Sequence, residues 1–444
     1  MQSVRSAIEE STPRGIAAGI ARLIHTGELA PGDRLPTVRA LAGELGVSPA
    51  TVSTAWQTLA AAGLIVSRGR SGSTVRAAVQ NWMPLRYQSL DGALDAALDL
   101  SQGTPDPVLL PRIEDAMRAA LEHTISSADS AAGYRRRPDI PELHDLLREQ
   151  WPAQVETLTV VDGALDGIDR AFASLLRFGD RAVIENPTFP PVLDLLEHYG
   201  VEPIGVELDR EGMLPSAFSA ALALGPSAIF LQPRAHNPTG VSMSRDRARE
   251  LGSILRRSNA AAGAVVIEDD HSGSIAAAEP VSLATFVPDR VIHVRSFSKS
   301  HGPDLRIGAL GGPRPLVDRI VSRRLLGPGW TSRMTQAVLH RLLTEEASVG
   351  AVNGARDAYA ERQRRFAGAM TAAGMPFEVG DGINVWVPVP DERAAIVRLA
   401  AAGIRVAPGT PFQLSGEPHI RVTVGAISGD PGPIAVAIVD AARA

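Results

Sequence analysis

The sequence predicts an α/β protein with a mostly parallel main sheet, preceded by a small helical domain. From residue 98 onward, short apolar runs alternate with stretches of helical periodicity, which is typical of parallel strands joined by helices. Residues 1–77 instead carry three helical patterns and a hairpin pattern. The length of 444 residues also favours more than one domain.

The helical domain is defined by its periodicity and its turn residues. Ile16, Ile20 and Leu23 recur on one face of its first pattern. Gly46 is a suitable end for the second helix, and Ser48 is a suitable N-cap for the third. The predicted elements are helices over 13–27, 37–45 and 49–62, and a two-stranded wing over 64–75.

This order of elements is that of a winged helix-turn-helix, which places its third helix in the major groove of DNA. Small polar side chains gather at the start of that helix, and arginines flank it. Residues 1–77 carry a net charge of +3 and the remainder −8, as expected if this end of the chain meets a polyanion. The candidate DNA-binding residues are Arg39, Ser48, Thr51, Thr54, Arg68 and Arg70.

Residues 78–97 have few periodic apolar positions and are expected to form a linker. A larger domain is predicted over 98–444, with a smaller α/β part from about residue 370 to the end. Its main strands are expected at 158–161, 182–184, 228–231, 265–267 and 291–294, and those of the smaller part at 383–387, 404–406 and 420–424.

One residue type occurs only once. The chain has 44 basic residues, and Lys299 is the single lysine among them. Arginine keeps its proton near neutral pH, whereas a lysine ε-amine can lose it when burial or nearby cations lower its pKa, and it then attacks carbonyls. Lys299 lies between serines, with Arg306 a short way downstream. The pattern predicts an imine to an aldehyde cofactor that carries an anionic group, and pyridoxal phosphate fits that description.

Polar residues that follow other predicted strands are expected beside Lys299, because open parallel sheets bind ligands at the carboxyl ends of their strands. Asp269 and Asp270 end a buried strand, and either carboxylate can hold a protonated pyridine nitrogen. The Asn237 amide can donate to the cofactor hydroxyl, and Phe189 can stack on a flat ring.

A phosphate site is expected at the start of a predicted helix. Gly163 and Ala164 open the helix that follows the strand over 158–161, and a helix N-terminus binds phosphate through its free backbone N–H groups. Arg306 would complete this site with charge-assisted hydrogen bonds.

Two resemblances sharpen this interpretation. The segment Pro31–Ala42, with Gly46-Val47-Ser48, resembles the GntR family of bacterial regulators. The motifs around Lys299, from about Leu98 to the C-terminus, resemble fold type I pyridoxal-phosphate proteins of the aspartate aminotransferase kind. A GntR-type module ahead of an aminotransferase-like domain is the architecture of the MocR subfamily.

By this resemblance Lys299 is the Schiff-base lysine. Ser296 and Ser298 are implied to bind the phosphate together with Arg306. Tyr134 resembles the tyrosine that reaches the phosphate of a neighbouring subunit, so the resemblance also implies a homodimer.

The resemblance assigns three further residues. Arg421 resembles the arginine that grips the α-carboxylate of a substrate. Asp269 is the better match to the partner of the pyridine nitrogen, although the register against Asp270 stays open by one residue. His271 stands where such regulators usually carry a tyrosine that contacts the cofactor oxygen.

The function expected is that of a DNA-binding transcriptional regulator. An amine or amino-acid effector would displace Lys299 from the internal aldimine, form an external one, and bias the DNA-binding arms. The alternative is an active aminotransferase that carries a DNA-binding module, and the sequence leaves catalytic turnover open.

Composition excludes several other classes. The chain has no cysteine, which excludes disulfides, thiol nucleophiles and cysteine-based zinc sites, and no other metal site is expected. No secretory signal and no membrane-spanning apolar stretch are visible, so a cytoplasmic protein is expected.

Overall fold

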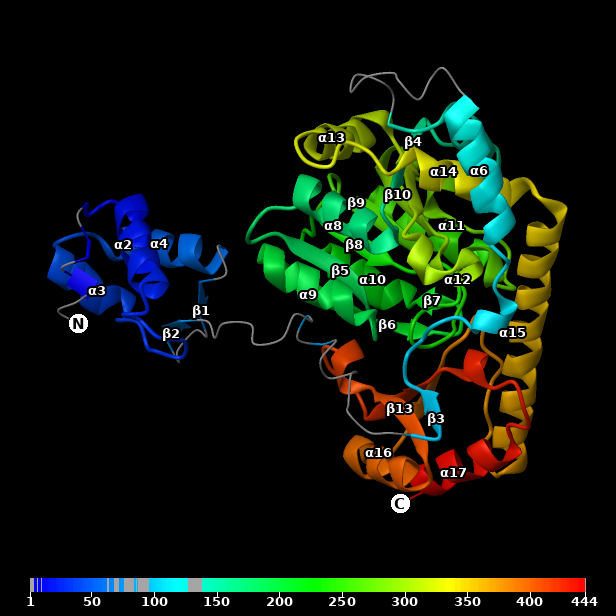
Figure 1. Ribbon diagram of the computed structural model, residues 1–444. Coiled ribbons are helices and arrows are strands. Elements are labelled where there is room, and N and C mark those ends of the chain that lie inside the picture. Colours follow the sequence, from blue (N-terminus) through cyan, green and yellow to red (C-terminus); the bar gives the residue numbers. More distant parts are fainter. Residues whose placement is uncertain are drawn as a thin grey trace. The chain divides into compact units, whose positions relative to one another are not determined.

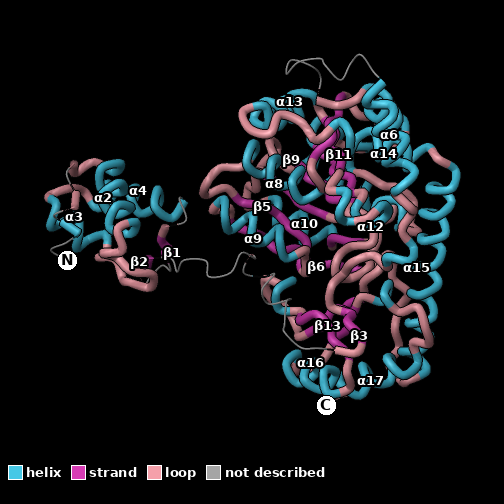
Figure 2. Tube along the Cα trace, in the orientation of Figure 1, coloured by secondary structure: helices cyan, strands magenta, loops and turns pink. Residues whose placement is uncertain are grey.

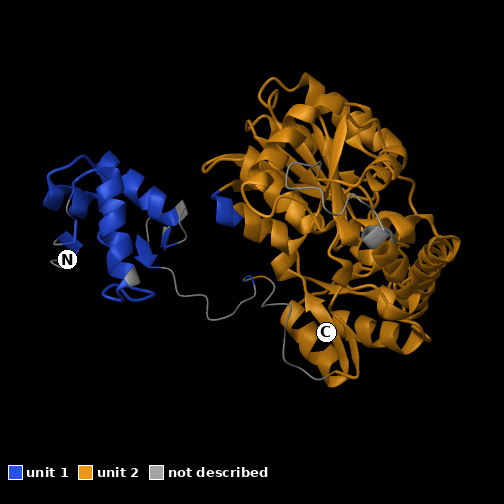
Figure 3. Cartoon of the chain, turned by 45° about the horizontal axis from the view of Figure 1, so that its top comes forward, with its two compact units in different colours: residues 1–84, 197–200 blue, residues 85–196, 201–444 orange. Residues whose placement is uncertain are grey.

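The computed structural model describes residues 4–5, 7–8, 10–61, 64–67, 72–75, 84, 86, 96–126 and 138–443. The chain divides into two compact units (Figure 3). The first holds residues 1–84, with the short segment 197–200, and the second holds the remainder. Residues 197–199 are the last residues of helix α9 (Pro190–Tyr199), which otherwise belongs to the second unit.

The first unit has the predicted order of elements. Thr12 caps its first helix by accepting a hydrogen bond from Gly15 N–H at 3.0 Å, and Thr37 caps the second in the same way from Ala40 N–H at 3.2 Å. Gly46 ends the second helix with φ of +66°, a left-handed conformation that favours glycine. The elements are α2 (Pro13–His25), α3 (Val38–Leu45), α4 (Pro49–Ala61), β1 (Ile65–Ser67) and β2 (Ser73–Val75).

This unit has an apolar core of its own. Ile16 and Ile20 of α2, Leu41 of α3, and Val52 and Trp56 of α4 are all buried in one cluster. The strands β1 and β2 pair antiparallel and close the cluster at one side. The winged helix-turn-helix predicted from the sequence is therefore confirmed within the described residues.

The second unit is built on an eight-stranded sheet in the order β4-β11-β10-β9-β8-β5-β6-β7 (Figures 1 and 2). β10, β9, β8, β5 and β6 pair in parallel, while β11 is antiparallel to both of its neighbours. The strands are β4 (Thr157–Val161), β5 (Arg181–Asn186), β6 (Glu202–Asp209), β7 (Gly212–Met213), β8 (Ala228–Leu231), β9 (Val265–Asp270), β10 (Val291–Ser296) and β11 (Gly308–Gly312).

The five predicted main strands are confirmed as β4, β5, β8, β9 and β10, but β6, β7 and β11 were not predicted. β11 has the sequence Gly-Ala-Leu-Gly-Gly, which lacks the apolar signal of a strand. It needs small residues, because a Cβ on Gly308 would lie 3.0 Å from the Ala164 nitrogen. β11 therefore contains glycine instead of the usual β-branched and aromatic residues, because it packs closely against the start of the helix at Ala164.

Helices cover both faces of this sheet. α8 packs beside Val161, Val294 and Leu310, whereas Leu143 and Leu147 of α7 pack on the opposite face. The central strands β8, β9 and β10 are therefore buried on both sides. The helices are α6 (Glu114–Ser126), α7 (Pro141–Glu149), α8 (Ala164–Leu175), α9 (Pro190–Tyr199), α10 (Pro215–Leu222), α11 (Arg245–Arg257), α12 (Ser298–His301), α13 (Arg314–Leu325), α14 (Arg333–Thr344) and α15 (Glu346–Ala372).

A smaller sheet forms the C-terminal part, in the order β12-β14-β13-β3. Its strand β3 comes from the beginning of the second unit and pairs in parallel with β13, so this part also includes residues far upstream of 370. Its elements are β3 (Leu98–Leu100), β12 (Val385–Pro388), β13 (Ile404–Pro408), β14 (His419–Val422), α16 (Glu392–Ala401) and α17 (Gly432–Ala442). No helix among the described residues is long and apolar enough to span a membrane.

Candidate functional site

The predicted site residues come together at the carboxyl ends of the parallel strands. Asp269 ends β9, and Lys299 lies just after β10, in α12. Gln232, which follows β8, links two of the segments: its Nε2 donates to Asp269 Oδ2 at 2.8 Å, and its Oε1 accepts from the Asn237 N–H at 2.8 Å. The crossovers of the sheet thus bring residues from distant parts of the sequence to one edge.

Lys299 is half-buried at this edge, and its Nζ donates to the Gly103 carbonyl oxygen. Burial is the main cause that lowers the pKa of the Lys299 ammonium to about 8; the charge of Arg421 contributes to the fall, and the charge of Asp269 opposes it. A fraction of this amine is therefore unprotonated near neutral pH, as a nucleophile requires.

Asp269 is buried with one oxygen unsatisfied. Its Oδ2 accepts from Gln232, whereas its Oδ1 is buried and has no hydrogen-bond partner within the described residues. Burial is the main cause that raises the pKa of Asp269 to about 7, and the charge of Asp270 adds to the rise. His293 and Lys299 oppose it. An unsatisfied buried oxygen of this kind is costly unless something pairs with it.

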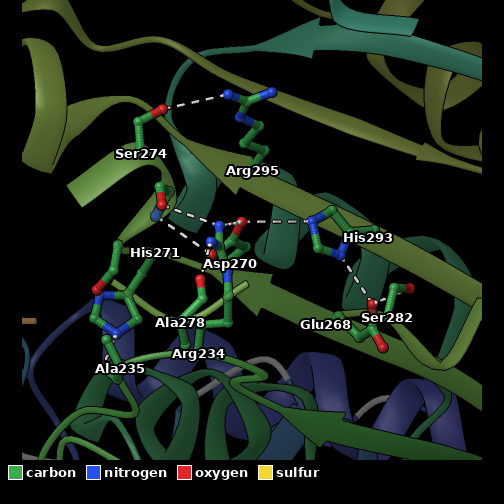
Figure 4. Close-up of polar contacts among 12 residues, drawn as sticks. Arg234, Ala235, Glu268, Asp270, His271, Ser274, Ala278, Ser282, His293 and Arg295 are labelled. Carbon is green, nitrogen blue, oxygen red and sulfur yellow. Dashed lines mark hydrogen bonds and ion pairs between the residues drawn. The ribbon is translucent and has the colours of Figure 1, made fainter. Parts of the chain in front are cut away.

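Asp270, the next residue, is fully engaged elsewhere. Its Oδ2 lies 2.6 Å from Arg234 Nη2 and 3.8 Å from His293 Nε2, and Figure 4 shows these two side chains on either side of it. Although burial by itself would raise the pKa of Asp270, Arg234 and His293 hold it well below its usual range. Glu268 accepts from His293 Nδ1 at 2.8 Å, which extends this network.

Gly163 and Arg306 meet at the start of α8. Gly163 is the N-cap residue of α8, with φ of +102°, and Arg306 Nη2 donates to the Asp162 carbonyl at 3.4 Å. A Cβ on Gly163 would lie 2.7 Å from that same Arg306 nitrogen. The helix N-terminus and the guanidinium therefore face one small space, and glycine is needed there.

Arg421, on β14, reaches from the smaller sheet into the same region. It is buried, lies 4.9 Å above the Phe412 ring, and donates to the Ser101 carbonyl and to Asn237 Oδ1 at 3.4 Å. Asn237 Oδ1 also accepts from Asn384 Nδ2 at 3.4 Å. Two donors on Oδ1 leave the Nδ2 of Asn237 pointing elsewhere, and this nitrogen has no partner among the described residues.

His271 has partners for both ring nitrogens. Its Nε2 lies 2.9 Å from the Ala235 carbonyl oxygen, to which it must donate, and its Nδ1 lies 3.4 Å from Ser272 Oγ. Burial, assisted by the charge of Lys299, lowers the pKa of His271 to about 4. The imidazole is therefore neutral at physiological pH.

The remaining cofactor candidates lie nearby or outside the described residues. Ser296 is buried and its Oγ accepts from Ser298 N–H at 3.3 Å. Phe189 is half-buried just before α9, and Ala164 begins α8. Tyr134 lies outside the described residues.

On the first unit, the start of α4 presents hydroxyl groups. Ser48 Oγ accepts from the Thr51 N–H at 3.2 Å, and the two hydroxyls lie 2.9 Å apart. Thr54 is exposed and donates to the Ala50 carbonyl at 3.0 Å, and Arg39 of α3 is also exposed. Arg68 and Arg70 lie outside the described residues.

Family comparisons agree with this two-part architecture. Residues 12–75 match the bacterial regulatory proteins of the gntR family, and residues 96–431 match aminotransferase class I and II. The vitamin B6 salvage pathway transcriptional repressor PtsJ of Salmonella typhimurium is 33% identical over 429 residues, which cover 95% of this chain and 96% of that protein.

The chain belongs to the MocR-type transcriptional regulators of the GntR family. Another such regulator, TauR of Rhodobacter capsulatus, is 29% identical over 441 residues and matches 88% of this chain and 87% of its own. A kynurenine aminotransferase of Pyrococcus horikoshii has a similar fold, with a TM-score of 0.69 at 21% identity over 80% of this chain and 92% of its own. The predicted fold type I architecture is thereby confirmed.

Sequence reasoning about this MocR-type regulator missed the residues that orient the candidate groups. Gln232 holds both Asp269 and the Asn237 backbone, and Thr423 accepts from Gly103 N–H at 2.9 Å. Gln232 directly follows an apolar strand, so its position at the sheet edge was a usable signal. The Gly103 contact was not foreseeable, because it joins residues more than three hundred positions apart.

The raised pKa of Asp269 predicts how the stability of the protein depends on pH. The folded-state pKa is raised from 3.8 to about 7, so this carboxyl favours folding below pH 4 and loses that contribution as pH rises through about 7. In cofactor-free protein, Asp269→Asn should remove a fall of up to about 4 kcal/mol in the free energy of unfolding over this range. Denaturant titrations from pH 4 to pH 8 measure it.

Asp270→Asn is the matched control, because it alters the neighbouring carboxylate and leaves Arg234 unpaired. This variant should be less stable than wild type at neutral pH. An unchanged pH dependence in Asp269→Asn would show that Asp269 titrates normally.

Proposed function

We propose that this MocR-type regulator binds pyridoxal phosphate at Lys299 and controls transcription in response to an amine or amino acid. The observation that carries the proposal is the pairing of the chain's single lysine, half-buried with a lowered pKa, with a buried carboxylate that has one oxygen unsatisfied among the described residues. These are the two polar ends that the cofactor requires, an amine for its aldehyde and an acceptor for its ring nitrogen.

The surrounding residues fit this cofactor. Asp269 Oδ1 would accept from the protonated ring nitrogen. The unsatisfied Oδ1 of Asp269, beside an Asp270 that is already paired with Arg234, supports Asp269 as the partner. The helix start at Gly163 and Ala164, with Arg306 beside it, suits a phosphate group. Ser296 is the register partner of Gly308, which packs against this helix start, and Ser298 remains our candidate for the same group. Phe189 remains our candidate for the ring face.

Asn237 is the better candidate donor to the cofactor hydroxyl. Its Nδ2 is available because Arg421 and Asn384 both donate to its Oδ1. His271 Nε2 could donate to the cofactor only if its hydrogen bond to the Ala235 carbonyl were broken. We therefore assign His271 to holding the Ala235 turn beside the cofactor, with a neutral ring that adds no charge to the site.

The bound cofactor supplies an aldehyde that exchanges one primary amine for another. Lys299 provides the resident amine, and its lowered pKa favours the neutral form that can leave and return. Arg421, buried beside Asn237, would bind the carboxylate of an amino-acid effector. As a free amine Lys299 donates to the Gly103 carbonyl, so its release by an effector would restore this contact and would link the effector to β3 and the smaller sheet.

Two further elements belong to the proposal. A homodimer is expected, with Tyr134 reaching the phosphate of the neighbouring subunit, and the exposed Met117 and Leu121 of α6 and Met334 of α14 offer an apolar surface for it. Double-stranded promoter DNA is the expected partner of the first unit, contacted by Arg39, Ser48, Thr51, Thr54, Arg68 and Arg70. A bacterial regulator that binds DNA acts in the cytoplasm.

The second candidate function is catalytic transamination. It is favoured by the aminotransferase family match over residues 96–431 and by the presence of Lys299, Asp269 and Arg421 together. A regulator should change its DNA affinity when cofactor and effector bind, whereas an aminotransferase that only carries a DNA-binding module should not.

The first prediction concerns the cofactor bond. Reduction with borohydride in the presence of pyridoxal phosphate should attach the cofactor covalently to Lys299, because the only competing amine is the α-amino terminus. Peptide mapping by mass spectrometry identifies the modified residue. Lys299→Arg keeps the charge and should remain unlabelled. An unmodified Lys299 in the reduced wild type would exclude the proposed cofactor site.

The second prediction concerns DNA. Arg39→Ala should weaken binding to DNA upstream of the protein's own gene and reduce the slope of log affinity against log salt by about one, as for the loss of one phosphate contact. A salt series of electrophoretic or fluorescence titrations measures both. Arg398→Ala, an exposed arginine on α16, is the control. Equal slopes in the Arg39→Ala and Arg398→Ala variants would count against Arg39 as a DNA contact.

The third prediction concerns coupling between effector and DNA, which must be reciprocal. Wild-type promoter affinity should change when pyridoxal phosphate and a recognised amino acid are both present. Lys299→Ala should keep promoter binding but lose this response, since the first unit has its own core. Arg421→Ala should lose the response to carboxylated effectors alone.

Promoter titrations with and without cofactor and a panel of amines measure this coupling. An affinity that is the same in every cofactor state, together with sustained keto-acid production, would replace the regulator proposal with the aminotransferase one.

A further inference from the structure

A cavity of about 380 Å³ lies on the other side of the sheet from Asp269. Side chains alternate along β9 and β10, so Asp270 and Arg295, which are register partners, face away from Asp269. Gln150 and Pro152, which follow α7, border the cavity, as does the segment from Gly273 to Pro280. It is therefore distinct from the space around Lys299.

The walls of this cavity carry an excess of positive charge. Three arginines border it, Arg234, Arg295 and Arg356, against two acids, Asp270 and Glu279. Asp270 is used by Arg234 at 2.6 Å, and Arg234 also donates to the carbonyls of Gly273 and Ala278. Glu279 is exposed at the rim. The cavity thus contains one cation that has no ion-pair partner among the described residues.

That cation is Arg295. Within the described residues it has no carboxylate within ion-pair distance, and its polar contacts are long: 3.5 Å to the Gln150 carbonyl and 3.4 Å to Ser274 Oγ. Figure 4 shows its guanidinium turned toward Ser274 and away from Asp270. Its orientation is held by stacking 5.2 Å above the Phe297 ring.

A guanidinium in this position is costly to the protein. Burial lowers the pKa of Arg295, the charge of Asp270 raises it and the charge of Arg234 lowers it, and an arginine remains protonated at physiological pH. A partly buried charge without a counter-ion is unfavourable unless something pairs with it. The planar fork of donors matches the two oxygens of a carboxylate or phosphate.

We propose that this cavity binds a small oxyanion, a carboxylate or a phosphate group, held by Arg295. Ser274 adds a hydroxyl beside the guanidinium. Arg356 on α15 also borders the cavity and contributes positive charge, and among the described residues its one ion pair is with the exposed Asp357 at 3.8 Å. The volume suits a small molecule at the lower end of the usual range for ligand pockets. Glu279 at the rim restricts the charged group of the ligand to the interior.

This site stands independently of the proposed function, because none of its arginines contacts the residues assigned to the cofactor. It must still be separated experimentally from the phosphate site at Arg306. The full-length protein, loaded with pyridoxal phosphate, is therefore titrated in parallel with an Arg306→Gln variant. Inorganic phosphate and succinate serve as the two probes, and calorimetry measures their binding.

We expect saturable binding of at least one probe in both proteins. Arg295→Gln should weaken it by about tenfold or more, as for the loss of hydrogen bonds to a charged group. Ser274→Asp should abolish it and raise thermal stability, because it supplies the missing carboxylate to Arg295. Arg356→Gln should weaken it less, and Arg398→Gln, an exposed arginine elsewhere, should leave it unchanged.

The two probes identify the class of ligand. Binding of phosphate alone assigns a phosphate ester, and binding of succinate alone assigns a carboxylate. The proposal is overturned if neither probe binds, or if Ser274→Asp and Arg356→Gln bind as tightly as wild type. These two variants keep the test valid even if Arg295→Gln does not fold.

Discussion

The alternation of side chains at the end of β9 is the constraint on which the rest of the site depends. It turns two adjacent carboxylates to opposite faces of one sheet. Asp270 meets Arg234 and His293 and is neutralised, whereas Asp269 meets one amide and keeps an unsatisfied oxygen. The same chemical group therefore serves as a structural ion pair on one face and as a candidate ligand on the other.

The ion pair on the far face supports the ligand on the near face. Arg234 lies in the loop after β8, two residues beyond Gln232. Gln232 is held by Asp269 Oδ2, and its own Oε1 accepts from the Asn237 N–H, which fixes the turn that carries Asn237. Glu268 and His293 hold the two strands together below this point, with a separation of 2.8 Å. Burying so many charges is unfavourable unless each has a partner, and here the network provides one for nearly all of them.

The smaller sheet is tied to the same edge by a short segment at the start of the second unit. Gly103 accepts from Lys299 and donates to Thr423, while the Ser101 carbonyl accepts from Arg421. Since β3 directly precedes this segment, Lys299 is connected to the smaller sheet through the Gly103 carbonyl. The first unit, with its own buried cluster around Trp56, needs none of these contacts to fold.

The sequence by itself determined the two-part architecture, five strands of the main sheet and the single lysine, because these depend on local periodicity and composition. It left Asp269 and Asp270 unresolved, since adjacent residues at a strand end share the same local pattern. It also missed β11 and the roles of Gln232, Gly103 and Arg295. Only the tertiary structure decided these, because burial, hydrogen-bond partners and compensating charges come from residues that are distant in the chain and meet only when the sheet is assembled.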